Sequence, residues 1–146
     1  QKRLQMALNE TPHVRGINNH MGSRFTEEQE PMAVVMKELH RRKLFFLDSA
    51  TTVRSVAMDA ALNAGVPYLR RDVFLDHVLA ESFVKAQLGQ LIRRAKVQGT
   101  ALAIGHPHEV TLKVLKEESA TFQRERIAVV PPSQLLPVKI SKTDYR

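Results

Sequence analysis

The chain has 146 residues, of which 43% are hydrophobic and 25% charged, so its length and composition suit one globular domain and exclude a mainly disordered chain. No apolar run approaches the ~18 residues of a membrane-spanning helix, and the absence of cysteine excludes disulfides, zinc–thiolate sites and a cysteine nucleophile. The net charge of +7 raises the question of an anionic partner, but the basic residues are dispersed and only 5% of residues are aromatic, which argues against nucleic-acid binding.

Helical and strand patterns alternate along the whole chain, which we treat as a single domain over residues 1–146. Thr26, followed by acidic residues, predicts a helix N-cap, and Gly65 and Gly99 predict helix ends. Residues 138–146 have no clear pattern and are left as an irregular tail. The predicted elements are helices at 2–9, 26–42, 55–63, 79–97 and 110–122, and strands at 14–18, 44–47, 67–69, 101–104 and 127–130.

The predicted strands are almost uniformly apolar, which is typical of parallel strands covered by helices on both faces. The pattern therefore indicates an α/β fold, either a doubly wound sheet or part of a (β/α) barrel. In such folds the residues that carry chemistry lie at the carboxyl ends of the strands. The polar residues at those ends, which we expect to converge on one face, are Asn19, His20, Asp48, Ser49, Arg71, Asp72, His106 and Ser133.

Two of these strand ends carry a histidine, and histidine is the commonest metal ligand in proteins. His20 and His106, together with one carboxylate, would form a site for a divalent metal, best Zn²⁺, with an open position for water. The carboxylate candidates are Asp48, Asp72 and Asp76. The alternative is structural: a backbone carbonyl holds His106, and the aspartates cap helices.

The remaining histidines are interpreted as surface residues or as residues behind the ligands, and His108 is the least certain because it lies two positions from His106.

Arg71 and Asp72 are adjacent, so on an extended backbone their side chains point to opposite faces. Arg71 could orient a catalytic carboxylate, and Asp72 could accept a hydrogen bond from the second ring nitrogen of a histidine. Alternatively, Arg71 forms a surface ion pair and Asp72 caps a helix.

Four runs, in the order GINNHMGS (16–23), LFFLDS (44–49), RDVFLD (71–76) and AIGHP (103–107), resemble the motifs of the divergent polysaccharide deacetylase family. The resemblance extends over residues 16–133. It implies a distorted (β/α) barrel related to carbohydrate deacetylases, a bound divalent metal, and a periplasmic or cell-envelope location.

The chain departs from the family pattern at its start. Family members carry an Asp-Asp motif on an earlier strand, which supplies a metal ligand and a general base, and no such motif precedes residue 16. A complete barrel also needs about 200 residues or more. We therefore expect an incomplete barrel that lacks its N-terminal elements, is inactive or nearly so alone, and could form a homo-oligomer through its open sheet edge.

The leading functional hypothesis is a metal-dependent hydrolase that removes acetyl groups from an N-acetylated polysaccharide such as peptidoglycan or chitin. His20 is the first metal ligand, and His106 is either the second ligand or the general acid; the sequence leaves both roles open. Asn19, Asp48 and Ser49 would bind the sugar. The alternative hypothesis is a non-catalytic glycan-binding or cell-envelope scaffold protein.

Overall fold

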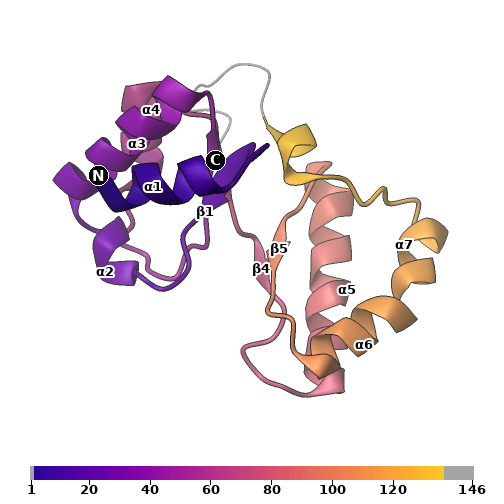
Figure 1. Cartoon of the computed structure of the whole chain (residues 1–146). Helices are drawn as coiled ribbons and strands as arrows, with labels where there is room; N and C mark the ends of the chain where they lie inside the picture. The colour runs from indigo at the N-terminus through magenta and orange to yellow at the C-terminus, as the bar shows by residue number, and fades with distance from the viewer. Residues whose placement is uncertain (1, 137–146) are drawn as a thin grey trace. The chain divides into compact units, whose positions relative to one another are not determined.

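The structure is a computed structural model that describes residues 2–136. Its described residues form two compact units, one made of residues 2–70 with 133–136 and the other of residues 71–132 (Figure 1). Both units are α/β, and every strand pair in them is parallel. A 3₁₀ helix, η1 (Pro132–Leu135), begins at the last residue of the second unit.

The first unit is built around a three-stranded parallel sheet in the order β1-β2-β3. The register pairs Ile17 with Phe46 and Leu47 with Leu69, so the three strands end close to one another in the sheet. The elements of this unit are α1 (Lys2–Glu10), β1 (Gly16–Asn18), α2 (Ser23–Thr26), α3 (Gln29–Arg42), β2 (Phe45–Asp48), α4 (Ala57–Ala64) and β3 (Tyr68–Arg70).

The core of the first unit lies between the sheet and helices α3 and α4, which pack on each other. Small alanines on α4 allow this close approach, and apolar residues three and four positions apart on α3 form its buried stripe. The most buried core residues are Met32, Met36, Leu39, Ala57, Ala61, Val66 and Tyr68.

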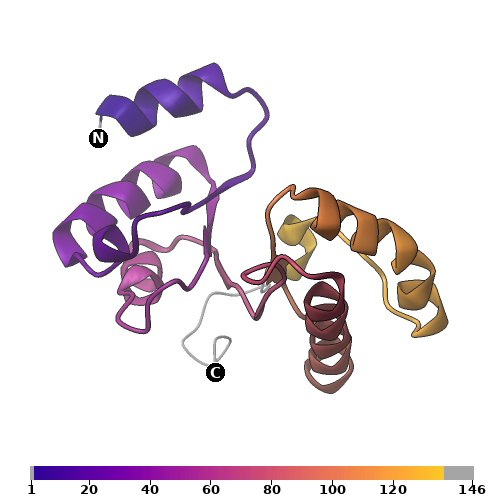
Figure 2. The ribbon, with the colours of Figure 1, turned by 90° about the horizontal axis from the view of Figure 1, so that it is seen from below.

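Helix α1 runs alongside α3 (Figure 2) and is tied to it by polar side chains. Glu38 of α3 is 3% exposed and accepts hydrogen bonds from Gln5 of α1 and from Arg41 and Arg42. Arg42 also donates to Asn9 at 2.7 Å. Because both arginines neutralise Glu38, this buried carboxylate holds two helices together.

The second unit is built around a two-stranded parallel sheet. Its register pairs Val73 with Ala103 and Phe74 with Ile104. Helix α5 lies along this strand pair and also packs on α6 (Figure 1). The elements are β4 (Val73–Phe74), α5 (Glu81–Gln98), β5 (Ala103–Ile104), α6 (Glu109–Glu117) and α7 (Ser119–Arg124), and the buried core residues are Val73, Leu75, Val84, Leu88 and Val114.

The structure corrects the predicted start of the long first-unit helix. Thr26 does not cap it, because Thr26 ends the separate one-turn helix α2 and its hydroxyl donates to the carbonyl of Ser23 at 2.8 Å. Helix α3 begins at Gln29, after Glu28 as N-cap, and runs to Arg42 as expected. Gly65 and Gly99 follow their helices in the left-handed conformation, as predicted.

Two further differences concern strands. The apolar residues 127–130 are not a strand, and Val129 is 78% exposed, because an apolar run forms a strand only where a neighbouring strand can pair with it. Strand β4, in contrast, is too short to show a pattern and exists through its pairing with β5. The helix predicted at 110–122 is divided at Glu118 into α6 and α7.

The predicted parallel α/β class is confirmed, whereas the two sheets are small and open. The barrel and the single domain over residues 1–146 stay predictions. The tail predicted at residues 138–146 lies outside the described residues.

Candidate functional site

In the first unit, hydrogen bonds join the polar residues that follow β1 to those that follow β2. The backbone amide of Ser49 donates to Asn19 Oδ1 at 2.8 Å, and the Ser49 hydroxyl donates to the Asn19 carbonyl at 2.5 Å. Asn18 Nδ2 donates to the Leu47 carbonyl and to Ser49 Oγ, each at 2.8 Å. The structure therefore brings together Asn19 and Ser49, two of the residues predicted to bind sugar.

Asp48, the third predicted sugar-binding residue, is 1% exposed at the end of β2. Its carboxylate accepts hydrogen bonds from the Tyr68 hydroxyl at 3.0 Å, the Ser55 hydroxyl at 2.8 Å and the Ala50 amide at 2.8 Å. These bonds hold the loop after β2, in which Ala50 has a left-handed backbone with φ of 49°. Contact of Asp48 with a sugar stays a prediction.

His20 follows β1 and is exposed. The two residues after it, Met21 and Gly22, have φ angles of 47° and 128°, so the chain turns sharply at this point. Ser23 Oγ donates to Thr51 Oγ1 at 2.9 Å, which links this turn to the loop after β2. The sequence thus presents His20 on a shaped loop at a strand end, as expected from the polar run.

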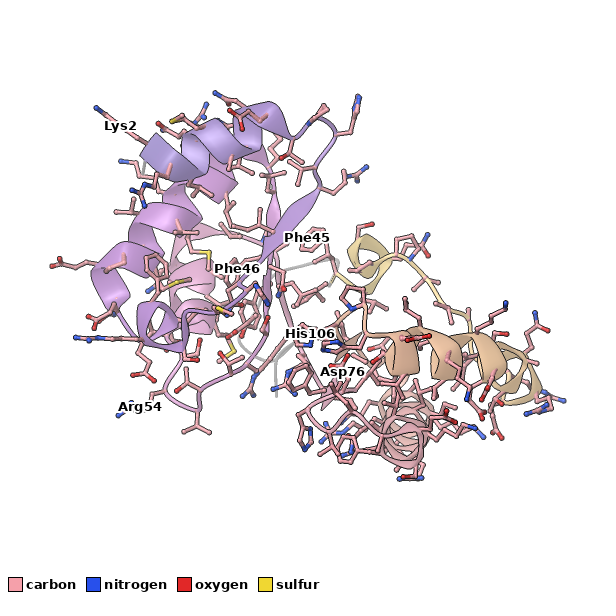
Figure 3. The ribbon with its side chains drawn as sticks, turned by 60° about the horizontal axis from the view of Figure 1, so that its bottom comes forward. Lys2, Phe45, Phe46, Arg54, Asp76 and His106 are labelled. Atoms are coloured by element: carbon pink, nitrogen blue, oxygen red, sulfur yellow. The ribbon has the colours of Figure 1, made fainter. Side chains whose placement is uncertain are left out.

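In the second unit, the segments that follow β4 and β5 bring Asp76 and His106 into contact (Figure 3). Nδ1 of His106 lies 3.1 Å from Asp76 Oδ1, and the His106 backbone amide donates to Asp76 Oδ2 at 2.6 Å. The Asp76 side chain is fully buried, whereas that of His106 is 39% exposed. A buried carboxylate therefore orients a partly exposed imidazole.

Asp76 is ionised in this setting. Burial would raise the pKa of the Asp76 carboxyl, but hydrogen bonds from the His106 amide, the buried Thr111 hydroxyl and the His106 ring hold that pKa below its ordinary value. The Thr111 hydroxyl donates to Asp76 Oδ2 at 2.9 Å. Because the carboxylate is ionised, Nδ1 of His106 carries the shared proton, and Nε2 is the ring nitrogen able to exchange a proton with a ligand.

Gly105 allows this contact to form. A Cβ at this position would lie 3.2 Å from Asp76 Oδ2 and 3.3 Å from Leu75 Cβ, which is tighter than ordinary van der Waals contact. A side chain at the residue before His106 would therefore push Asp76 or Leu75 away by a few tenths of an ångström.

A second imidazole lies beside this pair. The rings of His106 and His108 have centroids 5.4 Å apart, and ligand atoms of Asp76, His106 and His108 all lie within 4.8 Å of one another. Among residues 2–136, this is the group of three such side chains near enough to share a metal ion. From the sequence, His108 was predicted to lie on the surface or behind the ligands and was the least certain of these histidines because of its spacing from His106; it is exposed, and it lies beside the Asp76–His106 pair.

Arg71 and Asp72, both predicted as catalytic, form the short connection between β3 and β4. The Arg71 guanidinium stacks over the Phe74 ring at 5.3 Å, and that ring lies 5.5 Å from the His106 ring. Asp72 Oδ2 accepts a hydrogen bond from the Leu102 amide at 2.8 Å. The carboxylate that holds the histidine is thus Asp76, and catalytic roles for Arg71 and Asp72 stay predictions.

The predicted pairing of His20 with His106 on one metal ion joins residues of different units and stays a prediction. No helix in the described part of the chain combines the length and the hydropathy needed to cross a bilayer.

Comparisons with known proteins give a consistent result. Residues 1–136 match the model of a family described as divergent polysaccharide deacetylase. The chain is 41% identical to the uncharacterized protein YibQ of Escherichia coli K12 over 133 residues, which are 91% of this chain and 41% of that protein. It is 40% identical to an uncharacterized protein of Haemophilus influenzae over 114 residues, which are 78% of this chain and 41% of that protein.

Among solved structures, the crystal structure of the uncharacterized protein ATU2773 from Agrobacterium tumefaciens C58 matches with a TM-score of 0.81 and 27% identity. The match covers 83% of this chain and 49% of that one. The chain thus spans less than half the length of these similar proteins.

Proposed function

Because this chain belongs to the divergent polysaccharide deacetylase family, we propose that it is part of a hydrolase that removes acetyl groups from an N-acetylated polysaccharide, peptidoglycan or a chitin-like polymer. The observation that carries the proposal is the contact between buried Asp76 and His106 at 3.1 Å. A buried carboxylate that orients a partly exposed imidazole is an arrangement that suits general acid–base catalysis.

In this proposal His106 is the general acid, one of the two roles that its sequence position left open. Asp76 accepts from Nδ1 and so fixes the tautomer and orientation of the ring. The same carboxylate stabilises the imidazolium, so that Nε2–H can donate its proton to the amine nitrogen as the amide C–N bond breaks. Thr111 and the His106 amide keep Asp76 ionised throughout this transfer.

The family implies a divalent metal, and the donor chemistry of this chain fits one. A neutral imidazole on a loop is a usual ligand of Zn²⁺, and His20 is the residue that we assign to the catalytic ion. When bound, such an ion polarises the acetamide carbonyl and lowers the pKa of water. Asn19 and Ser49, which hold the neighbouring loops together, would contact the sugar.

The family membership also supports proposals about the complete fold and the cellular location. We propose that the α/β units belong to a (β/α) barrel and that the protein works in the periplasm or cell envelope, where peptidoglycan lies. Cell fractionation followed by immunoblotting tests the location: recovery of the protein in the cytoplasmic fraction would contradict it.

The decisive experiment measures acetate release from peptidoglycan fragments and chito-oligosaccharides by the full-length protein and its variants. We expect His106→Gln to lower the rate by about 10²-fold or more, the usual contribution of a general acid. The matched control is His77→Gln, which removes an exposed imidazole that packs against Phe83. Equal rates for both variants would contradict the role of His106, and fragment binding without acetate release would favour the scaffold hypothesis.

A further inference from the structure

We propose that Asp76, His106 and His108 form an inhibitory binding site for a divalent transition-metal ion such as Zn²⁺. The three side chains come from the segment after β4 and from the segment between β5 and α6. Two imidazoles and one carboxylate are a donor set that suits Zn²⁺ rather than Mg²⁺ or Ca²⁺. This site differs from the one assigned to the catalytic ion, in which His20 is the ligand.

The spacing of the pair matches metal coordination. At Zn–N and Zn–O distances of about 2.0–2.1 Å, two ligand atoms of a tetrahedral site lie about 3.3 Å apart. Nδ1 of His106 and Oδ1 of Asp76 lie 3.1 Å apart. The two atoms that share a proton are therefore close enough to share an ion once the partly exposed His106 ring turns so that the Nδ1 lone pair faces the ion instead of Asp76 Oδ1.

The charge at Asp76 favours a cation. Its carboxylate is buried, and among the described residues no lysine or arginine forms an ion pair with it; His106 does. Buried charges in proteins are paired or coordinate metals. An ion between Asp76 and His106 would neutralise the carboxylate.

His108 supplies the third ligand. It precedes α6 at the N-cap position, yet its side chain makes no capping hydrogen bond. The residue is exposed, so its imidazole can turn toward His106, whose ring centroid is 5.4 Å away. The ring is thus available for coordination rather than used to hold the helix end.

Binding has a consequence for catalysis, and this part of the inference rests on the proposed function. Coordination through Nδ1 displaces the proton that His106 shares with Asp76, and that proton passes to solvent. The ring then cannot form the imidazolium that protonates the leaving amine. Excess Zn²⁺ should therefore inhibit acetate release.

The test measures metal binding directly. Zn²⁺ titrations by calorimetry, and the visible spectrum of added Co²⁺, are recorded for full-length protein in a His20→Ala background, so that the ion assigned to catalysis does not contribute. We expect His108→Gln to weaken this binding by more than about tenfold, as loss of a ligand does. His77→Gln, which removes a neighbouring exposed imidazole outside the group, should bind like the background protein.

The second arm uses full-length protein that keeps His20 and measures the rate of acetate release at increasing concentrations of added Zn²⁺. The rate of each variant is expressed relative to its own rate without added Zn²⁺. His108→Gln should require a more than tenfold higher Zn²⁺ concentration for half-inhibition. Unchanged Zn²⁺ binding in His108→Gln overturns the site, and binding without inhibition overturns its inhibitory role. If no acetate is released under any condition, the proposed function fails, while the titrations still decide whether the site exists.

Discussion

Substitution of Thr111 tests how the buried carboxylate of the site is held. Thr111 is 1% exposed, and its hydroxyl donates to Asp76 Oδ2 at 2.9 Å. Thr111→Val keeps the shape but removes this bond, which as a bond to a charged acceptor contributes about 1.5–3 kcal/mol. The new buried methyl returns up to about 0.8 kcal/mol. We expect a net loss of about 1–2 kcal/mol in the free energy of unfolding.

Thr111→Ser is the matched control, because it keeps the hydroxyl and loses one buried methyl, at a cost of about 1 kcal/mol. Both variants should shift the urea midpoint by about 1 M or less, followed by circular dichroism. Only Thr111→Val loosens the support of Asp76 and His106, so only its rate of acetate release should fall, by about tenfold.

Two results would refute this reasoning. If Thr111→Val unfolds at the same urea concentration as the parent protein, the bond to Asp76 contributes no net stability. If both variants lose activity equally, the hydroxyl acts through packing alone and Thr111 is not a positioning residue.

Three further predictions concern hydrogen bonds and backbone packing outside the Asp76–His106 contact. Hydrogen bonds from Arg41 and Arg42 lower the pKa of the Glu38 carboxyl to about 2, from 4.5. The ionised Glu38 therefore stabilises the fold fully above about pH 4.5, and this contribution is lost as the pH falls toward 2. Glu38→Gln should make the free energy of unfolding less dependent on pH in this acid range. Gly16→Ala should lower the free energy of unfolding in urea by about 1–3 kcal/mol, because the added Cβ would lie 2.5 Å from the ring of Phe45. Gly89→Ala, in the middle of α5, should instead raise it by about 0.5–1 kcal/mol, because the nearest neighbour of the added Cβ is 3.4 Å away. The opposite order of the two effects would contradict this packing. Tyr68→Phe removes a hydrogen bond to buried Asp48 and should lower the thermal midpoint by several degrees, and an unchanged midpoint would show that the bond adds no stability.

The long helices and the apolar strands could be predicted from the sequence because their signals are local. Periodic apolar residues placed α3 and α5, and Gly65 and Gly99 placed two helix ends. The prediction errors arose where pairing with a neighbouring segment decides whether residues form a strand. Residues 127–130 are apolar enough for a strand but have no pairing partner among the described residues, and the two-residue strand β4 exists through β5.

The candidate site shows the same division. The sequence alone determined that polar residues follow the strands, that His106 and Asp76 were candidates, and that the chain resembles carbohydrate deacetylases. Only the tertiary structure decided which carboxylate holds His106, because the sequence left Asp48, Asp72 and Asp76 as candidates and suggested Asp72 as the partner of a histidine. The register of β4 with β5 and the missing Cβ of Gly105 select Asp76, and a contact between residues thirty positions apart depends on that geometry rather than on any local pattern.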